Sequence, residues 1–129
     1  MKLNAKKSGD VFKDLMRFTE KEISICPWIA ELSFEDILEE VQSEVDEVRR
    51  ADNPKELGRE LGDLFRDVLL AMIIARRDLG VKPVEKIIQS ILDKVRRRKP
   101  WVEEGKRVTR EEAVMIWNKV KEEESKGEN

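Results

Sequence analysis

The sequence contains no histidine and no tyrosine, and it has a single cysteine, Cys26. Zinc-type sites and histidine-based catalysis are therefore excluded, because they depend on imidazole groups or on several thiolates. One cysteine cannot form an internal disulfide, and it fits a reducing compartment. Any chemistry must use carboxylates, lysine, arginine, hydroxyl groups or a bound metal.

The chain also lacks long apolar runs and runs of strand-forming residues. No apolar stretch approaches the length of a membrane span or a signal peptide, so we expect a cytoplasmic protein without a membrane partner. The formal net charge of −2 gives no overall attraction to nucleic acid. The short basic run from Arg96 to Lys99 does not change this, because such a run in an acidic chain is mostly a solvated face.

What the sequence does contain is charge and helix formers. Charged residues make up 42% of the 129 residues, and this composition is typical of an all-α protein. We expect one domain over residues 1–129, a helical bundle of about five helices with antiparallel core helices. Residues 1–7 are basic and residues 125–129 are polar, and both segments are expected to be disordered. The narrow apolar stripes of such charged helices favour completion of the core by a second copy, at least as a homodimer.

Apolar spacing and capping signals place the expected helices. The first is expected over 8–22 and is followed by a break at Pro27. Ser33, with Asp36 three residues later, predicts a capping box that opens the second helix, which ends near residue 51. The other three are expected over 54–79 with Gly80 as the stop, from Lys82-Pro83 to the residue before Pro100, and from a Thr109–Glu112 capping box through Val120.

Carboxylates border the apolar stripes of the second and third expected helices. Residues at i, i+3 and i+4 share a helix face, and this spacing joins Glu40, Glu44 and Glu47 on one helix and Glu60 with Asp63 on the next. If the two stripes pack antiparallel, four or five carboxylates meet at one seam.

Such a cluster of carboxylates repels itself unless a cation lies in it. Magnesium takes oxygen ligands, keeps several waters and shares its remaining positions with a substrate phosphate, and facing carboxylates in helical bundles hold such ions. The alternative is a solvated face, because Asp and Glu are so frequent here that these pairs arise by chance. A di-iron bundle is disfavoured because such sites normally use Glu-x-x-His.

Two cations on the fourth expected helix, Lys94 and Arg98, lie four residues apart at the border of its stripe. They would suit a polyphosphate. Taken alone, however, these residues favour side chains that extend along the stripe to water and complement the helix dipole. On the last helix Trp117 and Lys121 share a face. The candidate neighbours of a nucleobase are Trp28, Trp101 and Trp117, but a tryptophan on a helix is more often part of the core.

Five short motifs follow one another along about residues 26–124. They are Cys26-Pro27-Trp28, Leu38-Glu39-Glu40 through Glu44, Glu60-Leu61-Gly62-Asp63-Leu64, the run from Lys94 to Pro100, and the run from Trp117 to Lys121. In this order they resemble the MazG-type nucleoside triphosphate pyrophosphohydrolases of the all-α NTP pyrophosphatase superfamily. The intact ELGDL segment and the order of the set make the resemblance specific.

The resemblance implies an activity and a mechanism. It implies Mg²⁺-dependent cleavage of an NTP or dNTP between the α and β phosphates, giving the monophosphate and pyrophosphate, with Mn²⁺ as a substitute ion. The implied metal ligands are Glu40, Glu44, Glu60 and Asp63. Our hypothesis for the mechanism is that a water attacks the α phosphorus and that a carboxylate not fully engaged by the metal, Glu47, accepts its proton.

The resemblance also implies substrate contacts and an assembly. The family's lysine and arginine contacts to phosphate correspond to Lys94 and Arg98, which would stabilise the leaving pyrophosphate, and its tryptophan and lysine near the end correspond to Trp117 and Lys121. Trp28 joins this substrate-binding set as a candidate neighbour of the base. Homodimers or dimers of dimers are the implied assembly.

The sequence departs from the family pattern at two places. The first Glu of the family's ExxE would stand at Val41; Glu40 is the best substitute because i, i+4 spacing keeps the face, or else an extra residue bulges the helix. Glu47 could also form an ExxE with Glu44. After Trp28, the usual acidic residue is an isoleucine and the following segment also differs. A competing hypothesis is therefore a catalytically degenerate interaction or dimerisation module of the same fold.

Overall fold

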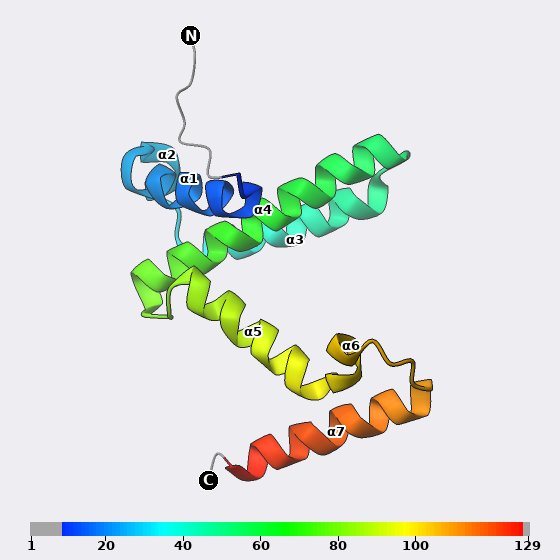
Figure 1. Ribbon diagram of the computed structural model, residues 1–129. Coiled ribbons are helices and arrows are strands. Elements are labelled where there is room, and N and C mark those ends of the chain that lie inside the picture. Colours follow the sequence, from blue (N-terminus) through cyan, green and yellow to red (C-terminus); the bar gives the residue numbers. More distant parts are fainter. Residues whose placement is uncertain (1–8, 128–129) are drawn as a thin grey trace. The chain divides into compact units, whose positions relative to one another are not determined.

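A computed structural model describes residues 9–127, and these residues form helices and no strands (Figure 1). The helices are α1 (Val11–Ile25), α2 (Pro27–Ala30), α3 (Phe34–Arg50), α4 (Pro54–Leu79), α5 (Val84–Arg98), α6 (Pro100–Glu104) and α7 (Arg110–Gly127). The all-α prediction is confirmed. The five long helices lie where the sequence predicts them, and two single-turn helices, α2 and α6, are additions.

Capping side chains begin the two helices of the central hairpin, and a glycine ends the second. The Ser33 hydroxyl accepts from the Asp36 backbone N–H and the Asp36 carboxylate accepts from the Ser33 N–H, both at 3.0 Å, so the predicted capping box is present. The Asn53 side chain accepts from the Glu56 N–H at 2.8 Å. Gly80 ends α4 with φ of 71°, a left-handed conformation that glycine adopts without steric cost.

The outer helices differ from the sequence-based expectation at their ends. α1 begins at Val11 because the Asp10 carboxylate accepts from the N–H groups of the first turn, at 3.0 Å from Phe12. α7 begins at Arg110, directly after Thr109, whose hydroxyl accepts from the Glu112 backbone N–H at 3.1 Å as in the predicted capping box.

The end of α7 corrects a prediction. The helix continues through Gly127, so residues 125–127, predicted to be disordered, are helical. Good helix formers persist to this point, and Lys126 pairs with Glu122 at i, i+4 over 3.5 Å. The predicted disorder of residues 1–7, like that of 128 and 129, lies outside the described residues.

The chain divides into two compact units, Met1–Val84 and Glu85–Asn129, and each is described by itself. In the first, α3 and α4 pack against each other as an antiparallel hairpin, and α1 packs on α2 and α4 (Figure 1). In the second, α5 is followed by α6 and α7. The expectation of one domain stays a prediction.

The buried core of the first unit occupies one end of the hairpin. Ile37 near the start of α3 is 1% exposed and Ile74 near the end of α4 is 0% exposed. The apolar residues that complete the core are Met16, Ile23, Ile29, Leu69, Leu70 and Val84. The second half of α3 and the first half of α4 contribute no fully buried residue. This outer half of the hairpin is therefore the part where charged side chains can meet at the seam.

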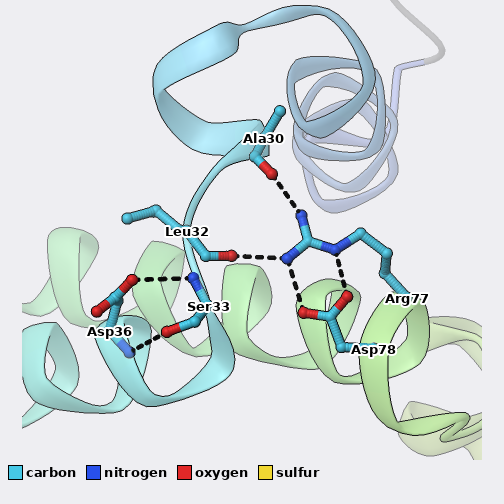
Figure 2. A network of polar contacts seen from close by, with 6 residues as sticks. All are labelled: Ala30, Leu32, Ser33, Asp36, Arg77 and Asp78. Carbon is cyan, nitrogen blue, oxygen red and sulfur yellow. Dashed lines mark hydrogen bonds and ion pairs between the residues drawn. The ribbon is translucent and has the colours of Figure 1, made fainter.

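Arg77 fixes the loop between α2 and α3 to the end of α4 (Figure 2). Its guanidinium donates to the carbonyl oxygens of Ala30 at 2.9 Å and Leu32 at 2.6 Å, and it pairs with the adjacent Asp78 at 2.7 Å. Bonds from a charged donor to two loop carbonyls hold α2 against the core end of the hairpin. Within residues 9–127, none of the helices has the length and apolar character that crossing a membrane requires.

Candidate metal centre

Three carboxylates from the two hairpin helices converge at the seam. Glu44 on α3, and Glu60 and Asp63 on α4, each offer one carboxylate oxygen, and these oxygens all lie within 4.8 Å of one another. Glu60 and Asp63 point the same way because residues at i and i+3 share a helix face. The antiparallel packing of α3 against α4 brings Glu44 to them. The structure thus joins three of the four residues expected to bind metal.

The electrostatics of Glu44 show that this arrangement is costly without a cation. Its Oε2 atom is buried and has no hydrogen-bond partner among the described residues. Desolvation raises the pKa of Glu44 to about 7, and the nearby carboxylates of Glu60, Asp63 and Asp67 contribute in the same direction. Near neutral pH this carboxyl group is therefore poised between its neutral and charged forms.

Asp67 extends the cluster by one turn of α4, and sequence reasoning missed it. Burial and the charges of Glu40 and Asp63 raise its pKa, while neighbouring Arg66 acts in the opposite direction. A signal was present, because Asp67 lies four residues after Asp63 and so shares its face. Glu40 is not among the three converging carboxylates, but its charge reaches Asp67.

The residues at the seam fit a hard divalent cation. Carboxylate oxygens are the ligands that Mg²⁺ and Mn²⁺ prefer, and the buried, partnerless Oε2 of Glu44 is an acceptor that such an ion would satisfy. Three carboxylates leave further coordination positions for water and a phosphate oxygen.

The geometry of α3 distinguishes the two alternatives for the departure at Val41, a substitute ligand at Glu40 or a bulge in the helix. The helix is uninterrupted from Phe34 to Arg50, so no extra residue bulges it around Val41. Glu40 and Glu44 therefore share a face, as expected. Glu47 lies outside the converging group, and its exposed carboxylate pairs with Arg50 at 3.2 Å.

The predicted substrate-binding residues have different surroundings. Trp28 on α2 is 76% exposed. In the second unit, the Arg98 guanidinium lies 4.9 Å from the centre of the Trp117 ring. Lys94 is half-buried and Lys121 is exposed. The structure thus brings together Arg98 and Trp117 from this set.

Comparison with known proteins identifies the family to which this chain belongs. A family model described as the MazG nucleotide pyrophosphohydrolase domain matches residues 30–103, more than half of the chain. The chain belongs to the MazG family. A solved structure, "Crystal structure of mazG-related protein from Thermotoga maritima", is 34% identical to it, with a TM-score of 0.78 over 85% of this chain and 98% of that chain. A search of the curated proteins found no match.

The MazG match confirms the resemblance predicted from the ordered motifs. Its span of 30–103 includes the converging carboxylates and Asp67, as well as Lys94 and Arg98. Trp28, Trp117 and Lys121 lie outside it. The family model thus covers the hairpin, α5 and most of α6, and α7 lies outside it.

Proposed function

We propose that this MazG-family chain is a nucleoside triphosphate pyrophosphohydrolase that uses Mg²⁺, or Mn²⁺ as a substitute. It would hydrolyse an NTP or dNTP between the α and β phosphates to a monophosphate and pyrophosphate. The observation that carries the proposal is the convergence of Glu44, Glu60 and Asp63 within 4.8 Å, with a buried, partnerless Glu44 oxygen.

In the proposed reaction the carboxylates hold the cation and the substrate supplies the leaving group. Glu44, Glu60 and Asp63 would be its ligands, with Glu40 and Asp67 adjacent. When bound, a divalent cation lowers the pKa of water and neutralises charge on the phosphates. The water would give up a proton to a carboxylate that the cation does not fully engage, and its oxygen would bond to the α phosphorus. The bond from that phosphorus to the bridging oxygen would break at the same time, so pyrophosphate leaves with that oxygen. Lys94 and Arg98 would stabilise the negative charge on the pyrophosphate.

The test is release of pyrophosphate from a panel of NTPs and dNTPs, with Mg²⁺ and with EDTA. We expect Mg²⁺-dependent release accompanied by a monophosphate product. Glu39→Gln is the matched control for substitutions in the cluster, because Glu39 is an exposed carboxylate on the same helix as Glu44. If a folded sample releases no pyrophosphate from any substrate, the proposal fails. The degenerate module, with Val41 as the lost ligand, then takes its place.

The proposal includes a homodimer or a dimer of dimers. It is supported by an exposed apolar stripe on α4, where Leu61 is 48%, Phe65 51% and Val68 37% exposed. These residues recur at helical spacing, as expected for a face that packs against another helix. A second copy of the chain is the proposed cover. Light scattering at micromolar concentration tests it, and a monomer there would contradict it.

A further inference from the structure

Two neighbouring arginines at the end of α5 share one carboxylate on α7. Arg97 Nη2 donates to Glu124 Oε2 at 3.1 Å, and Arg98 Nε donates to Glu124 Oε1 at 3.0 Å. The Arg98 side chain is 14% exposed, whereas that of Arg97 is 54% exposed. Arg98 is therefore the one of the pair whose orientation the surroundings determine.

The Trp117 ring supports the same guanidinium from a second direction. The Cζ atom of Arg98 lies 4.9 Å from the ring centre, and Nζ of Lys99 lies 5.6 Å from it. Both distances lie within the range of cation–π attraction. The tryptophan considered from sequence as a nucleobase neighbour thus contacts two cations. Since Glu124 balances only one of the positive charges of Arg97, Arg98 and Lys99, the cluster keeps a positive surplus.

Arg98 donates to Glu124 through its Nε atom alone. A guanidinium carries five N–H donors in a planar fork. The buried side-chain nitrogen and oxygen atoms without a partner, within the described part of the chain, are Glu44 Oε2 and Arg66 Nε. Because Nη1 and Nη2 of Arg98 are not among them, and no described residue accepts from them, they keep contact with solvent. Such a pair of donors matches the spacing of two phosphate oxygens.

The geometry points to Glu124 and Trp117 as positioning residues, which orient Arg98 so that Nη1 and Nη2 bind one phosphate group. This inference rests on the proposed function, in which Arg98 contacts the pyrophosphate part of the substrate. The competing role for Glu124 is simple neutralisation of charge. The two roles differ in sign: removing a neutralising carboxylate strengthens anion binding, whereas removing a positioning contact weakens it.

The experiment is titration of inorganic pyrophosphate into the full chain at fixed Mg²⁺ concentration, followed by calorimetry. Glu124→Ala is compared with Glu123→Ala, which removes the same charge from an exposed neighbouring position on α7. We expect Glu124→Ala to bind about fivefold to tenfold more weakly than Glu123→Ala. Glu124→Gln, whose amide oxygen can still accept from Nε, should recover part of the loss. Melting curves confirm that each variant is folded at the temperature of the titration.

The outcomes separate this inference from the proposed function because the probe is a product and needs no turnover. Binding by Glu124→Ala equal to or tighter than that of Glu123→Ala would overturn the positioning role. So would a Glu124→Gln variant as weak as Glu124→Ala, or a wild-type chain that does not bind pyrophosphate. Pyrophosphate binding with the expected order, but without hydrolysis of any NTP, would refute the proposed activity and leave the positioning role supported.

Discussion

The carboxylates of the α3–α4 hairpin and the arginines at the end of α5 are both clusters of like charge, but their neighbours differ. No described cation forms an ion pair with Glu44, Glu60 or Asp63, and desolvation and their mutual repulsion raise the pKa of Glu44. Each arginine, in contrast, pairs with a carboxylate. Arg96 pairs with Glu103 at 3.2 Å, and Arg97 and Arg98 both pair with Glu124. The acidic cluster therefore has no described counter-charge, whereas the basic cluster is already oriented by its carboxylate partners.

Removing one charge from the acidic cluster should have the largest effect. With Asp63→Asn or Glu60→Gln, we expect pyrophosphate release to fall at least about 100-fold, because a ligand is lost where charge is stabilised. The Tm in EDTA should stay the same or rise, since repulsion is relieved. Release and Tm are measured on the same samples, with Glu39→Gln as control. Full activity in both variants would remove these residues from the site.

Arg77 provides a charge whose role is structural. Replacing it with alanine releases the Ala30 and Leu32 carbonyls (Figure 2), and bonds from charged donors contribute about 1.5–3 kcal/mol. We expect the free energy of unfolding, measured in urea, to fall by about 2 kcal/mol while Mg²⁺ binding is unchanged. Arg59→Ala, at an exposed position of the same helix, should change it by less than about 0.5 kcal/mol. Equal effects of the two substitutions would show that the loop does not depend on Arg77.

The pKa of Glu44 predicts a smaller, pH-dependent difference. Since this pKa is raised from 4.5 to about 7, folding takes up a proton between these values, and the metal-free protein loses stability as pH rises through that window. We expect the Tm in EDTA to fall by a few degrees between about pH 5 and about pH 8. Adding Mg²⁺ at the higher pH should restore it, because the ion binds the deprotonated carboxylate.

Glu44→Gln is the control for this pH dependence, because its amide does not titrate. The variant should lose most of the slope of Tm against pH. It should also lose most of the stabilisation by Mg²⁺, because an amide is a weaker ligand than a carboxylate. Identical slopes in the wild type and the variant would assign the pH dependence to other groups.

Local sequence signals predict the features that depend on near neighbours. The capping boxes, the stop at Gly80 and the shared face of Glu60 and Asp63 all follow from spacings of a few residues, and they agree with the structure. The two single-turn helices were not predicted, because four or five residues are too few to show a helical period.

The register of one helix against another is the part that local spacing does not determine. On α3 taken alone, Glu40, Glu44 and Glu47 are equivalent members of one face. Packing against α4 brings Glu44 to the converging group, sets Glu40 near Asp67 and leaves Glu47 paired with Arg50. Asp67 could have been found by extending the α4 face one more turn. The choice among the three glutamates required the structure.

A substitution at Glu47 therefore tests how far the acidic site extends along α3, and it should have the smallest effect. It is the sequence-based candidate for proton acceptor, yet its side chain is 47% exposed and its described partner is Arg50. An exposed pair of this kind contributes less than about 1 kcal/mol, so we expect Glu47→Gln to change the Tm little and pyrophosphate release by less than about threefold. A general base would instead cost about 100-fold or more, with Arg50→Gln having no comparable effect. That larger loss would extend the site one turn toward the end of α3; the smaller one would confine it to the carboxylates that the hairpin itself brings together.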